Sequence, residues 1–322
     1  MLKKHGASAF LSRRSSVNMF RAQSSNNALP EPLFREPGRS ARWLVLVAPV
    51  PAILLGAFVM QRSGVPRAVW MQNVLVLTAM LLAAIGVSQA KPFRSLTVHP
   101  WIAFGVAFTM LASTFFEGDL DGVHRWISFG NYRLNAGAIC LPLLLIAASY
   151  LLRQNNFAIA FVVCVVPLLL LVAQPDFSAV VAYGTASLVL VGLQRPPLLH
   201  AVVLLAAVAA LVFWVAHRTD TLGPVVYVED IVSLAAQQSR LLAATAIVGL
   251  ALIPVSFYIA RAGLSKRVVP CLAVYFALSS GARLMGNFPV PFLGYGASAI
   301  IGYYITVAWL VGHLPPVAGW RR

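Results

Sequence analysis

Arginine and tryptophan side chains occur together in residues 117–133, the first of four stretches whose residue types could carry chemistry. Arg125 and Trp126 lie there between turn residues, and Arg133 ends the stretch. Guanidinium groups suit phosphate and carboxylate ligands, and tryptophan anchors at the level of lipid headgroups. The stretch predicts an interfacial element that binds anionic groups, although a plain interfacial loop with a tryptophan anchor explains its composition equally well.

The second stretch is the tripeptide Gln174-Pro175-Asp176, which interrupts a long apolar run. Pro175 lacks a backbone amide hydrogen and ends the helix before it, so Asp176 can cap the helix that follows. A carboxylate at a broken helix also marks ion or substrate sites in transporters. Capping and ligand binding therefore both stay open for Asp176.

Residues 224–240 form the third stretch, which contains the adjacent carboxylates Glu229 and Asp230 and ends at Arg240. The pattern predicts a short amphipathic helix opened by the two carboxylates, because the positive end of a helix lowers the cost of keeping them ionised. Capping is one role for the pair. A role in chemistry is the other, since desolvating charges beside apolar sequence is costly.

The fourth stretch, residues 287–298, has two prolines and closely spaced glycines and includes Tyr295 and Ser298. These residues force irregular backbone at the membrane edge. Such backbone is tolerated only where it lines a polar cavity or is buried in protein. Arg283, just upstream, could add a cation to that cavity.

The elements that must position these residues are apolar helices. Of the 322 residues, 60% are hydrophobic and 10% are charged, whereas soluble domains have about 25% charged residues. An ordinary water-soluble protein is thereby excluded. We predict an all-α, polytopic integral membrane protein with about ten transmembrane helices, since the apolar runs have the length that crosses a bilayer. The spans are expected at residues 43–60, 68–90, 101–116, 135–152, 157–173, 178–193, 198–216, 241–260, 268–283 and 297–313.

The charge distribution predicts the orientation of these helices. Residues 1–42 read as a flexible basic cytoplasmic tail, residues 43–313 as the ten-helix domain and residues 314–322 as a short cytoplasmic tail. With both termini in the cytoplasm, 17 of the 24 Lys and Arg residues fall on the cytoplasmic side, as the positive-inside rule requires. The net charge of +15 therefore reflects membrane topology, and no nucleic-acid partner is expected.

The four stretches, in this order, resemble the RodA- and FtsW-like SEDS family (shape, elongation, division and sporulation). Arg125-Trp126-Ile127 with Gly130 resembles the RWI motif and following glycine of that family, and Gln174-Pro175-Asp176 resembles its QPD motif. Residues 289–298 resemble its PxPFxSYGGSS motif. The resemblance covers residues 43–313, nearly the whole membrane part.

This resemblance implies a peptidoglycan glycosyltransferase that polymerises lipid II at the outer face of the bacterial inner membrane, in cell division or cell-shape control. The implied partners are the undecaprenyl diphosphate-linked substrate and a class B penicillin-binding protein. One carboxylate, Glu229 or Asp230, would act as base. The implied substrate-binding residues are Arg125, Trp126, Arg133, Asp176, Arg240, Arg283, Tyr295 and Ser298. No cofactor is expected, apart from a divalent cation held loosely by the diphosphate, because the histidines are scattered and the three cysteines lie in apolar runs.

Several residues depart from the family pattern and indicate a divergent member. The DFxFAxxxEE motif of the family aligns with residues 229–238, where Glu229 replaces the aspartate and Gln237 and Gln238 replace the two acids. Residues 135–138 and Leu141 replace its QPSE motif and a lysine one turn later. A catalytically inactive SEDS-like regulator of cell-wall synthesis therefore stays an alternative, as does a transporter or flippase of lipid-linked precursors centred on Asp176.

Overall fold

The computed structural model describes residues 39–89, 100–118, 122–130, 132–152, 156–218, 222–261 and 264–312. All of them belong to one unit of the chain, Phe34–Arg322. The predicted C-terminal tail and all but the last four residues of the predicted N-terminal tail lie outside the described residues.

Apolar runs of the sequence form the helices of this unit, and each predicted span coincides with a helical segment to within a few residues. The span expected at residues 43–60 is made by two consecutive helices, α2 and α3. The α-helices are α2 (Arg39–Val47), α3 (Val50–Arg62), α4 (Arg67–Gln89), α5 (Pro100–Ser113), α6 (Ala136–Leu151), α7 (Phe157–Ala173), α8 (Phe177–Gly192), α9 (Leu198–Ala216), α10 (Ile231–Gln238), α11 (Arg240–Ala260), α12 (Val268–Ser280) and α13 (Ala297–Gly312). Two 3₁₀ turns, η2 (Thr114–Phe116) and η4 (Ala282–Met285), extend α5 and α12.

Within the described ranges, four helical segments are long and apolar enough to cross a membrane: Ser40–Arg62, Arg67–Gln89, Leu198–Ala216 and Arg240–Ala260. The other predicted spans are apolar helical segments of 10–17 residues. Backbone polar groups in a bilayer must be satisfied within the segment, and an α-helix satisfies them. The prediction of an all-α, polytopic membrane fold is confirmed.

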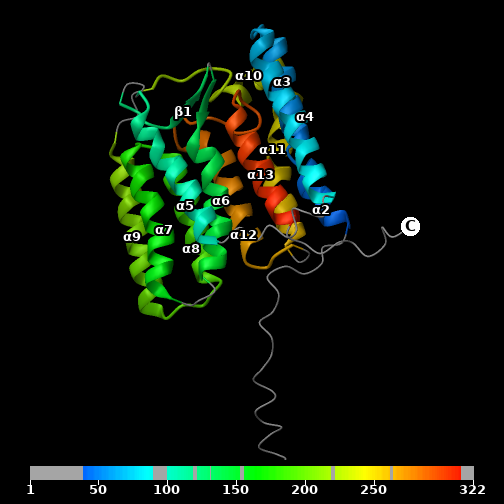
Figure 1. Ribbon diagram of the computed structural model, residues 1–322. Coiled ribbons are helices and arrows are strands. Elements are labelled where there is room, and N and C mark those ends of the chain that lie inside the picture. The colour runs from blue at the N-terminus through cyan, green and yellow to red at the C-terminus, as the bar shows by residue number, and fades with distance from the viewer. Residues whose placement is uncertain are drawn as a thin grey trace, which may run out of the picture. The chain divides into compact units, whose positions relative to one another are not determined.

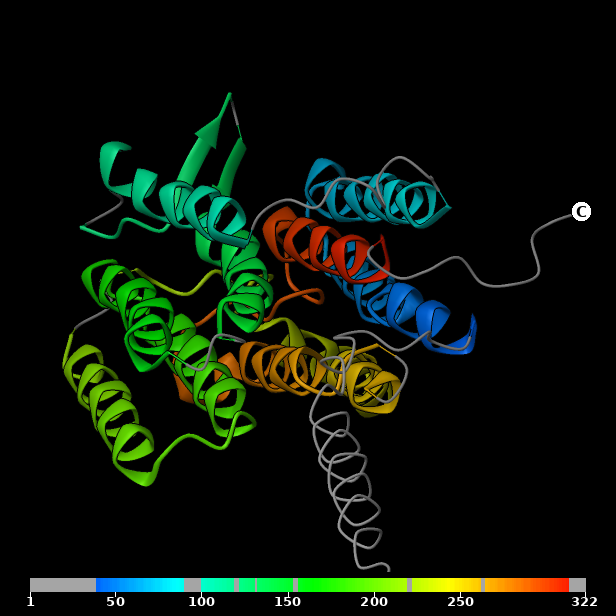
Figure 2. The ribbon, with the colours of Figure 1, turned by 60° about the horizontal axis from the view of Figure 1, so that its bottom comes forward.

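Helix α6 lies inside the bundle and organises the packing around it. It contacts α5, α7, α8, α12 and α13, and residues are buried along its whole length, from Ala136 to Leu151. By contrast, α4 and α9 bury few residues, and α9 exposes most of its apolar side chains. Figures 1 and 2 show α6 between these outer helices.

Glycines allow two close backbone contacts that bring the functional segments together. A β-carbon at Gly302 of α13 would clash with the carbonyl group of Ala138 on α6. A β-carbon at Gly56 of α3 would clash with the carbonyl group of Leu293 in the loop before α13. Small residues at helix contacts permit this close approach. The proline-rich loop, residues 288–296, therefore packs directly against the backbone of α3 at Gly56.

A two-stranded antiparallel hairpin connects α5 to α6, and the sequence analysis did not predict it. Strand β1 (Trp126–Phe129) pairs with β2 (Tyr132–Asn135), with Trp126 opposite Asn135. Gly130 at the turn has a φ of +60°, which costs glycine little. Four-residue strands are too short for their alternation to show in the sequence. Figure 1 shows β1 and α10 at the same end of the helices.

Candidate functional site

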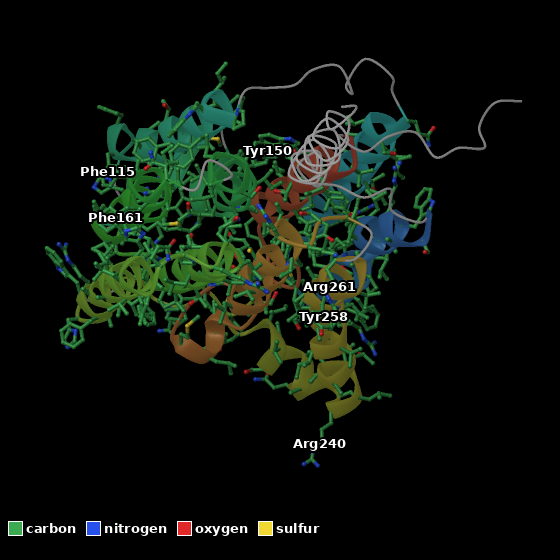
Figure 3. All side chains as sticks on the ribbon, turned by 90° about the horizontal axis from the view of Figure 1, so that it is seen from below. Phe115, Tyr150, Phe161, Arg240, Tyr258 and Arg261 are labelled. Carbon is green, nitrogen blue, oxygen red and sulfur yellow. The ribbon has the colours of Figure 1, made fainter. Side chains whose placement is uncertain are left out.

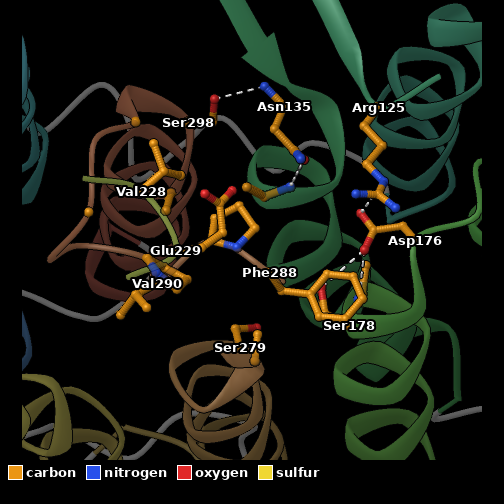
Figure 4. Close-up of a pocket in the computed structure, with 18 of the residues that line it drawn as sticks. Arg125, Asn135, Asp176, Ser178, Val228, Glu229, Ser279, Phe288, Val290 and Ser298 are labelled. Carbon is orange, nitrogen blue, oxygen red and sulfur yellow. Dashed lines mark hydrogen bonds and ion pairs between the residues drawn. The ribbon is translucent and has the colours of Figure 1, made fainter. Parts of the chain in front are cut away.

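A pocket of about 370 Å³ opens among the loops at this end of the bundle. The hairpin, the starts of α6, α8 and α13, the end of α12 and the loops 222–229 and 288–296 all contribute to its walls. Seven of the ten residues expected in the site line it: Arg125, Trp126, Arg133, Asp176, Glu229, Tyr295 and Ser298. Figure 4 shows Arg125 and Asp176 on one side of the pocket and Glu229 on the other.

Glu229 projects its carboxylate into this pocket from the turn before α10 (Figure 4). The turn is closed by two hydrogen bonds to the carbonyl oxygen of Val225, from the amide of Val228 at 2.8 Å and from the amide of Glu229 at 3.0 Å. In return, Glu229 Oε2 accepts a hydrogen bond of 2.6 Å from the amide of Val225. Only 9% of the residue is exposed.

The environment of Glu229 raises the pKa of its carboxyl group above the ordinary value. Burial is the largest cause, because it disfavours the charged form. Hydrogen bonds from backbone amides oppose burial, and the neighbouring Asp230 carboxylate adds a smaller upward shift. A carboxylate with a raised pKa holds a proton more strongly once it has accepted one.

Asp230 does not line the pocket, although it is adjacent to Glu229. Its Oδ1 atom accepts hydrogen bonds from Arg283 Nε at 2.9 Å and Arg283 Nη2 at 2.7 Å. The Nη1 atom of the same guanidinium donates to Gly286 O at 3.0 Å and to Asn287 Oδ1 at 3.1 Å. The expectation that Asp230 and Arg283 face the cavity is therefore not met, since each side chain is held by the other outside it.

Arg240 also lies away from the pocket. It begins α11 directly after Ser239, whose hydroxyl caps that helix by accepting from the amide of Leu241. The Arg240 side chain is exposed, and Figure 3 shows it projecting outward from the bundle. The expectation that Arg240 binds substrate in the pocket is therefore not met.

Asp176 has two roles in the structure. Its Oδ1 atom accepts hydrogen bonds from the amide of Ala179 and the hydroxyl of Ser178, both at 3.1 Å, so the predicted cap of α8 is confirmed. Its Oδ2 atom lies 3.7 Å from Arg125 Nε, and both side chains are buried. The guanidinium carbon of Arg125 also lies 5.9 Å from the ring centroid of Phe288. Arg125 is thus fixed as a buried cation in the pocket wall.

The remaining polar residues come from the hairpin and from α13. Arg133 is exposed on β2 and lines the mouth of the pocket. The amide of Asn135 donates to Ser298 Oγ at 2.8 Å, while Asn135 Oδ1 caps α6 by accepting from the amide of Ala138 at 2.9 Å. Ser298 therefore connects the start of α13 to the hairpin.

The structure also reveals pocket residues that the sequence analysis did not assign to the site. Asn135, Ala138 and Leu141 line the pocket, and they are the positions that depart from the QPSE motif and the lysine of the SEDS pattern. Phe288 lines it as well and contacts the Arg125 cation. The departures from the family pattern were the signal that could have placed the first three residues in the site.

Side chains that could bind a metal ion are not clustered in the described part of the chain. Among the described residues there is no group of three or more His, Cys, Asp or Glu side chains that could hold a metal ion. Glu229 and Asp176 are the acidic residues of the described pocket lining. The expectation that the protein has no cofactor stays a prediction.

Comparison with known proteins decides the fold. No family model and no curated protein matches the sequence. Solved structures do match: the rod shape determining protein RodA of Thermus thermophilus superimposes with a TM-score of 0.65 at 16% identity, covering 84% of this chain and 95% of RodA. This chain has the RodA fold. An aspartate-to-alanine point mutant of the same RodA matches with a TM-score of 0.66 at 16% identity, covering 84% of this chain and 96% of that chain.

The RodA fold also occurs in a third match, a chain from a structure that concerns the coordination of polymerization and crosslinking by a peptidoglycan synthase complex. Its TM-score is 0.63 at 14% identity, with 84% of this chain and 96% of that chain covered. The SEDS-like fold expected from the sequence motifs is therefore confirmed, and the low identities show a divergent sequence on the RodA fold.

Proposed function

We propose that this protein is a SEDS-type glycosyltransferase that polymerises lipid II at the outer face of the bacterial inner membrane. The RodA-like fold supports a role in cell-wall synthesis. The observation that carries the proposal is the position of Glu229, whose buried carboxylate points into a pocket that also contains the arginines Arg125 and Arg133. A base and cations for a departing diphosphate are thus present in one cavity.

In the proposed reaction, a sugar hydroxyl of one substrate attacks the anomeric carbon of a second, diphosphate-linked sugar. The new glycosidic C–O bond forms while the C–O bond to the diphosphate breaks, and the hydroxyl proton passes to Glu229. General base catalysis of this kind contributes about 10² to 10⁴ in rate. The raised pKa of Glu229 suits the role, since it makes the ionised carboxylate a stronger base.

The two arginines would stabilise the diphosphate as it leaves. Arg133 is exposed at the pocket mouth, where a headgroup arriving from the membrane surface would first meet it. Arg125 lies deeper and is held by Asp176 and Phe288. Guanidinium groups match phosphate oxygens with paired hydrogen bonds and act most strongly where water is excluded. Trp126, Tyr295 and Ser298 would complete the contacts with the substrate.

The proposed partner is a class B penicillin-binding protein. One of the matched chains belongs to a peptidoglycan synthase complex that coordinates polymerization and crosslinking, and a similar assembly would supply crosslinking to glycan chains made here. We further propose that the protein lies in the bacterial inner membrane with both termini in the cytoplasm. Its role would be in cell division or cell-shape control.

A second candidate function is a catalytically inactive SEDS-like regulator that binds the lipid-linked precursor without polymerising it. The observation that favours it is the pocket lining at Asn135, Ala138 and Leu141. Where the SEDS pattern has an acid and a lysine, this pocket presents a methyl group and an isobutyl group. Such a site would keep the anion-binding arginines but lose part of its proton-transfer machinery.

Lipid II polymerisation by purified protein tests these functions. Wild type, Glu229→Gln and Glu117→Gln would be purified in detergent with the candidate penicillin-binding protein, beside an active RodA pair. Glu117 follows α5 outside the pocket, so Glu117→Gln controls for the chemical change alone. We expect glycan chains from wild type and Glu117→Gln, and at least about a 100-fold lower rate from Glu229→Gln. No chains from wild type, with lipid II binding retained, would establish the regulator instead.

A further inference from the structure

Asn73 is a polar side chain that is fully buried in a helix with few buried residues. Helix α4 buries three residues, Asn73, Leu77 and Ala84, and Asn73 is completely inaccessible to solvent. Burying an amide is unfavourable unless both of its polar groups find partners. The contacts that satisfy Asn73 therefore show what the residue holds.

Both polar groups of the Asn73 side-chain amide form hydrogen bonds with the backbone of the proline-rich loop, residues 288–296. Its Nδ2 donates to Gly294 O at 2.9 Å, and its Oδ1 accepts from the amide of Gly296 at 3.2 Å. The residue between them, Tyr295, donates its hydroxyl to Gln72 Oε1 at 3.0 Å. One turn of α4 thus fixes three consecutive residues of the loop. The opposite amide orientation would face donor with donor and acceptor with acceptor, so the assignment is unambiguous.

The same loop segment supports the turn that carries Glu229. The amide of Tyr295 donates to Tyr227 O at 3.0 Å, and the amide of Val290 donates to Val228 O at 3.1 Å. A β-carbon at Gly294 would clash with the carbonyl group of Val228. Residues 227 and 228 therefore rest on the loop that Asn73 holds, and Glu229 follows them directly.

We propose that Asn73 is a positioning residue for Glu229, acting through Gly294 and Gly296 on the turn that carries the carboxylate. Its catalytic consequence rests on the function proposed above, but the mechanical connection does not. Figure 4 shows Val290 and Val228 beside Glu229. Helix α4 lines no part of the described pocket, so Asn73 acts without contacting the substrate.

The connection has a readout that needs no enzymatic activity. The amide of Val225 is protected by Glu229 Oε2 itself, so its hydrogen exchange reports the position of that carboxylate. Local opening of such a turn is measured by amide hydrogen exchange. Asn73→Leu removes both hydrogen bonds of the amide while keeping a side chain of similar size that suits a membrane helix.

Tyr304→Phe provides the matched control. The Tyr304 hydroxyl is buried on α13 and donates to Leu46 O of α2 at 3.1 Å. Asn73→Leu removes two buried hydrogen bonds to the loop. Tyr304→Phe removes one buried hydrogen bond to a distant backbone carbonyl, and that bond involves neither the loop nor the turn. A general loosening of the bundle would affect both variants alike.

Hydrogen exchange of the full-length protein in detergent would be followed by mass spectrometry for residues 224–230 and 288–296. We expect Asn73→Leu to speed exchange about tenfold in both segments, as the loss of a hydrogen bond predicts, and Tyr304→Phe to leave both unchanged. The proposal is overturned if residues 224–230 stay as protected in Asn73→Leu as in wild type, or if Tyr304→Phe speeds exchange there equally.

A kinetic measurement separates this proposal from the proposed function. If wild type polymerises lipid II, Asn73→Leu should lower kcat by about 10- to 100-fold with little change in KM, because a displacement of about 1 Å at a catalytic group costs about 100-fold. An unchanged kcat would overturn the positioning role. Absence of polymer from wild type, together with faster exchange at residues 224–230 in Asn73→Leu alone, would reject the enzyme function and support the mechanical connection.

Discussion

Arg283 directs two hydrogen bonds, from Nε at 2.9 Å and from Nη2 at 2.7 Å, to a single oxygen of Asp230. This pair separates two carboxylates that are neighbours in the sequence. Asp230 is held outside the pocket, while Glu229 points into it. The proposed base is therefore Glu229, and Asp230 fixes the turn from the other side.

The Asp230–Arg283 pair should contribute modestly to stability. The two side chains are 26% and 37% exposed, and partly exposed ion pairs contribute about 0.2–1 kcal/mol. We expect Asp230→Asn and Arg283→Gln each to lower the free energy of unfolding by about that amount. The double variant should lose no more than the worse single variant, as thermal unfolding in detergent would measure. Additive losses would show that the two side chains act independently.

The raised pKa of Glu229 predicts the pH dependence of glycan formation. The base must be ionised to accept a proton, so the rate should fall on the acidic side with a midpoint above the ordinary value of 4.5. A profile of kcat/KM against pH reports ionisation in the free enzyme. A midpoint at or below 4.5 would contradict the burial argument.

The same pKa shift predicts how stability varies with pH. Because the folded state favours the protonated form, Glu229 contributes stability below pH 4.5 that is lost as the pH rises through its raised pKa. Glu229→Gln is uncharged at every pH. Its free energy of unfolding relative to wild type should therefore increase as the pH rises through that window. A difference that does not vary with pH would show that the folded protein leaves this pKa unshifted.

Gly294 should tolerate no side chain, because a β-carbon there would clash with the carbonyl group of Val228. Gly294→Ala is expected to destabilise the protein by about 1–3 kcal/mol, as overpacking does, and to displace Glu229. Gly105→Ala on α5 is the matched control, since a β-carbon there meets no atom within 4 Å. Thermal unfolding and lipid II polymerisation of the two variants would be compared, and equal effects would refute the prediction.

Asp176 combines a cap with a buried charge, and two substitutions separate these roles. Asp176→Asn keeps an oxygen that can cap α8 but removes the buried negative charge beside Arg125, which costs about 3–5 kcal/mol for a well-formed pair and less at a separation of 3.7 Å. Asp176→Ala also removes the cap, for a further loss of about 1 kcal/mol. The free energy of unfolding should therefore be highest for wild type, lower for Asp176→Asn and lowest for Asp176→Ala. Equal losses in both variants would indicate that the cap contributes nothing.

The sequence by itself determined the helices, because an apolar run that spans a bilayer can be recognised from its length and hydropathy alone. The span predicted at residues 198–216 is α9 residue for residue, and the span at 157–173 is α7. Pro175 followed by the capping residue Asp176 likewise predicted the break between α7 and α8, since proline has no amide hydrogen to donate and Asp176 can start the next helix. These signals are local and need no knowledge of the partner helices.

Only the tertiary structure decided which side chains share the pocket. Glu229 and Asp230 are chemically alike and adjacent, and the long-range contact from Arg283 is what turns Asp230 away. Asn73 was missed for a related reason: a lone asparagine in an apolar run predicts a buried partner but does not name it. Its partners, Gly294 and Gly296, lie more than 220 residues further along the chain. The length and hydropathy of an apolar run are enough to predict a helix, whereas contacts between distant segments fix the direction of each functional side chain.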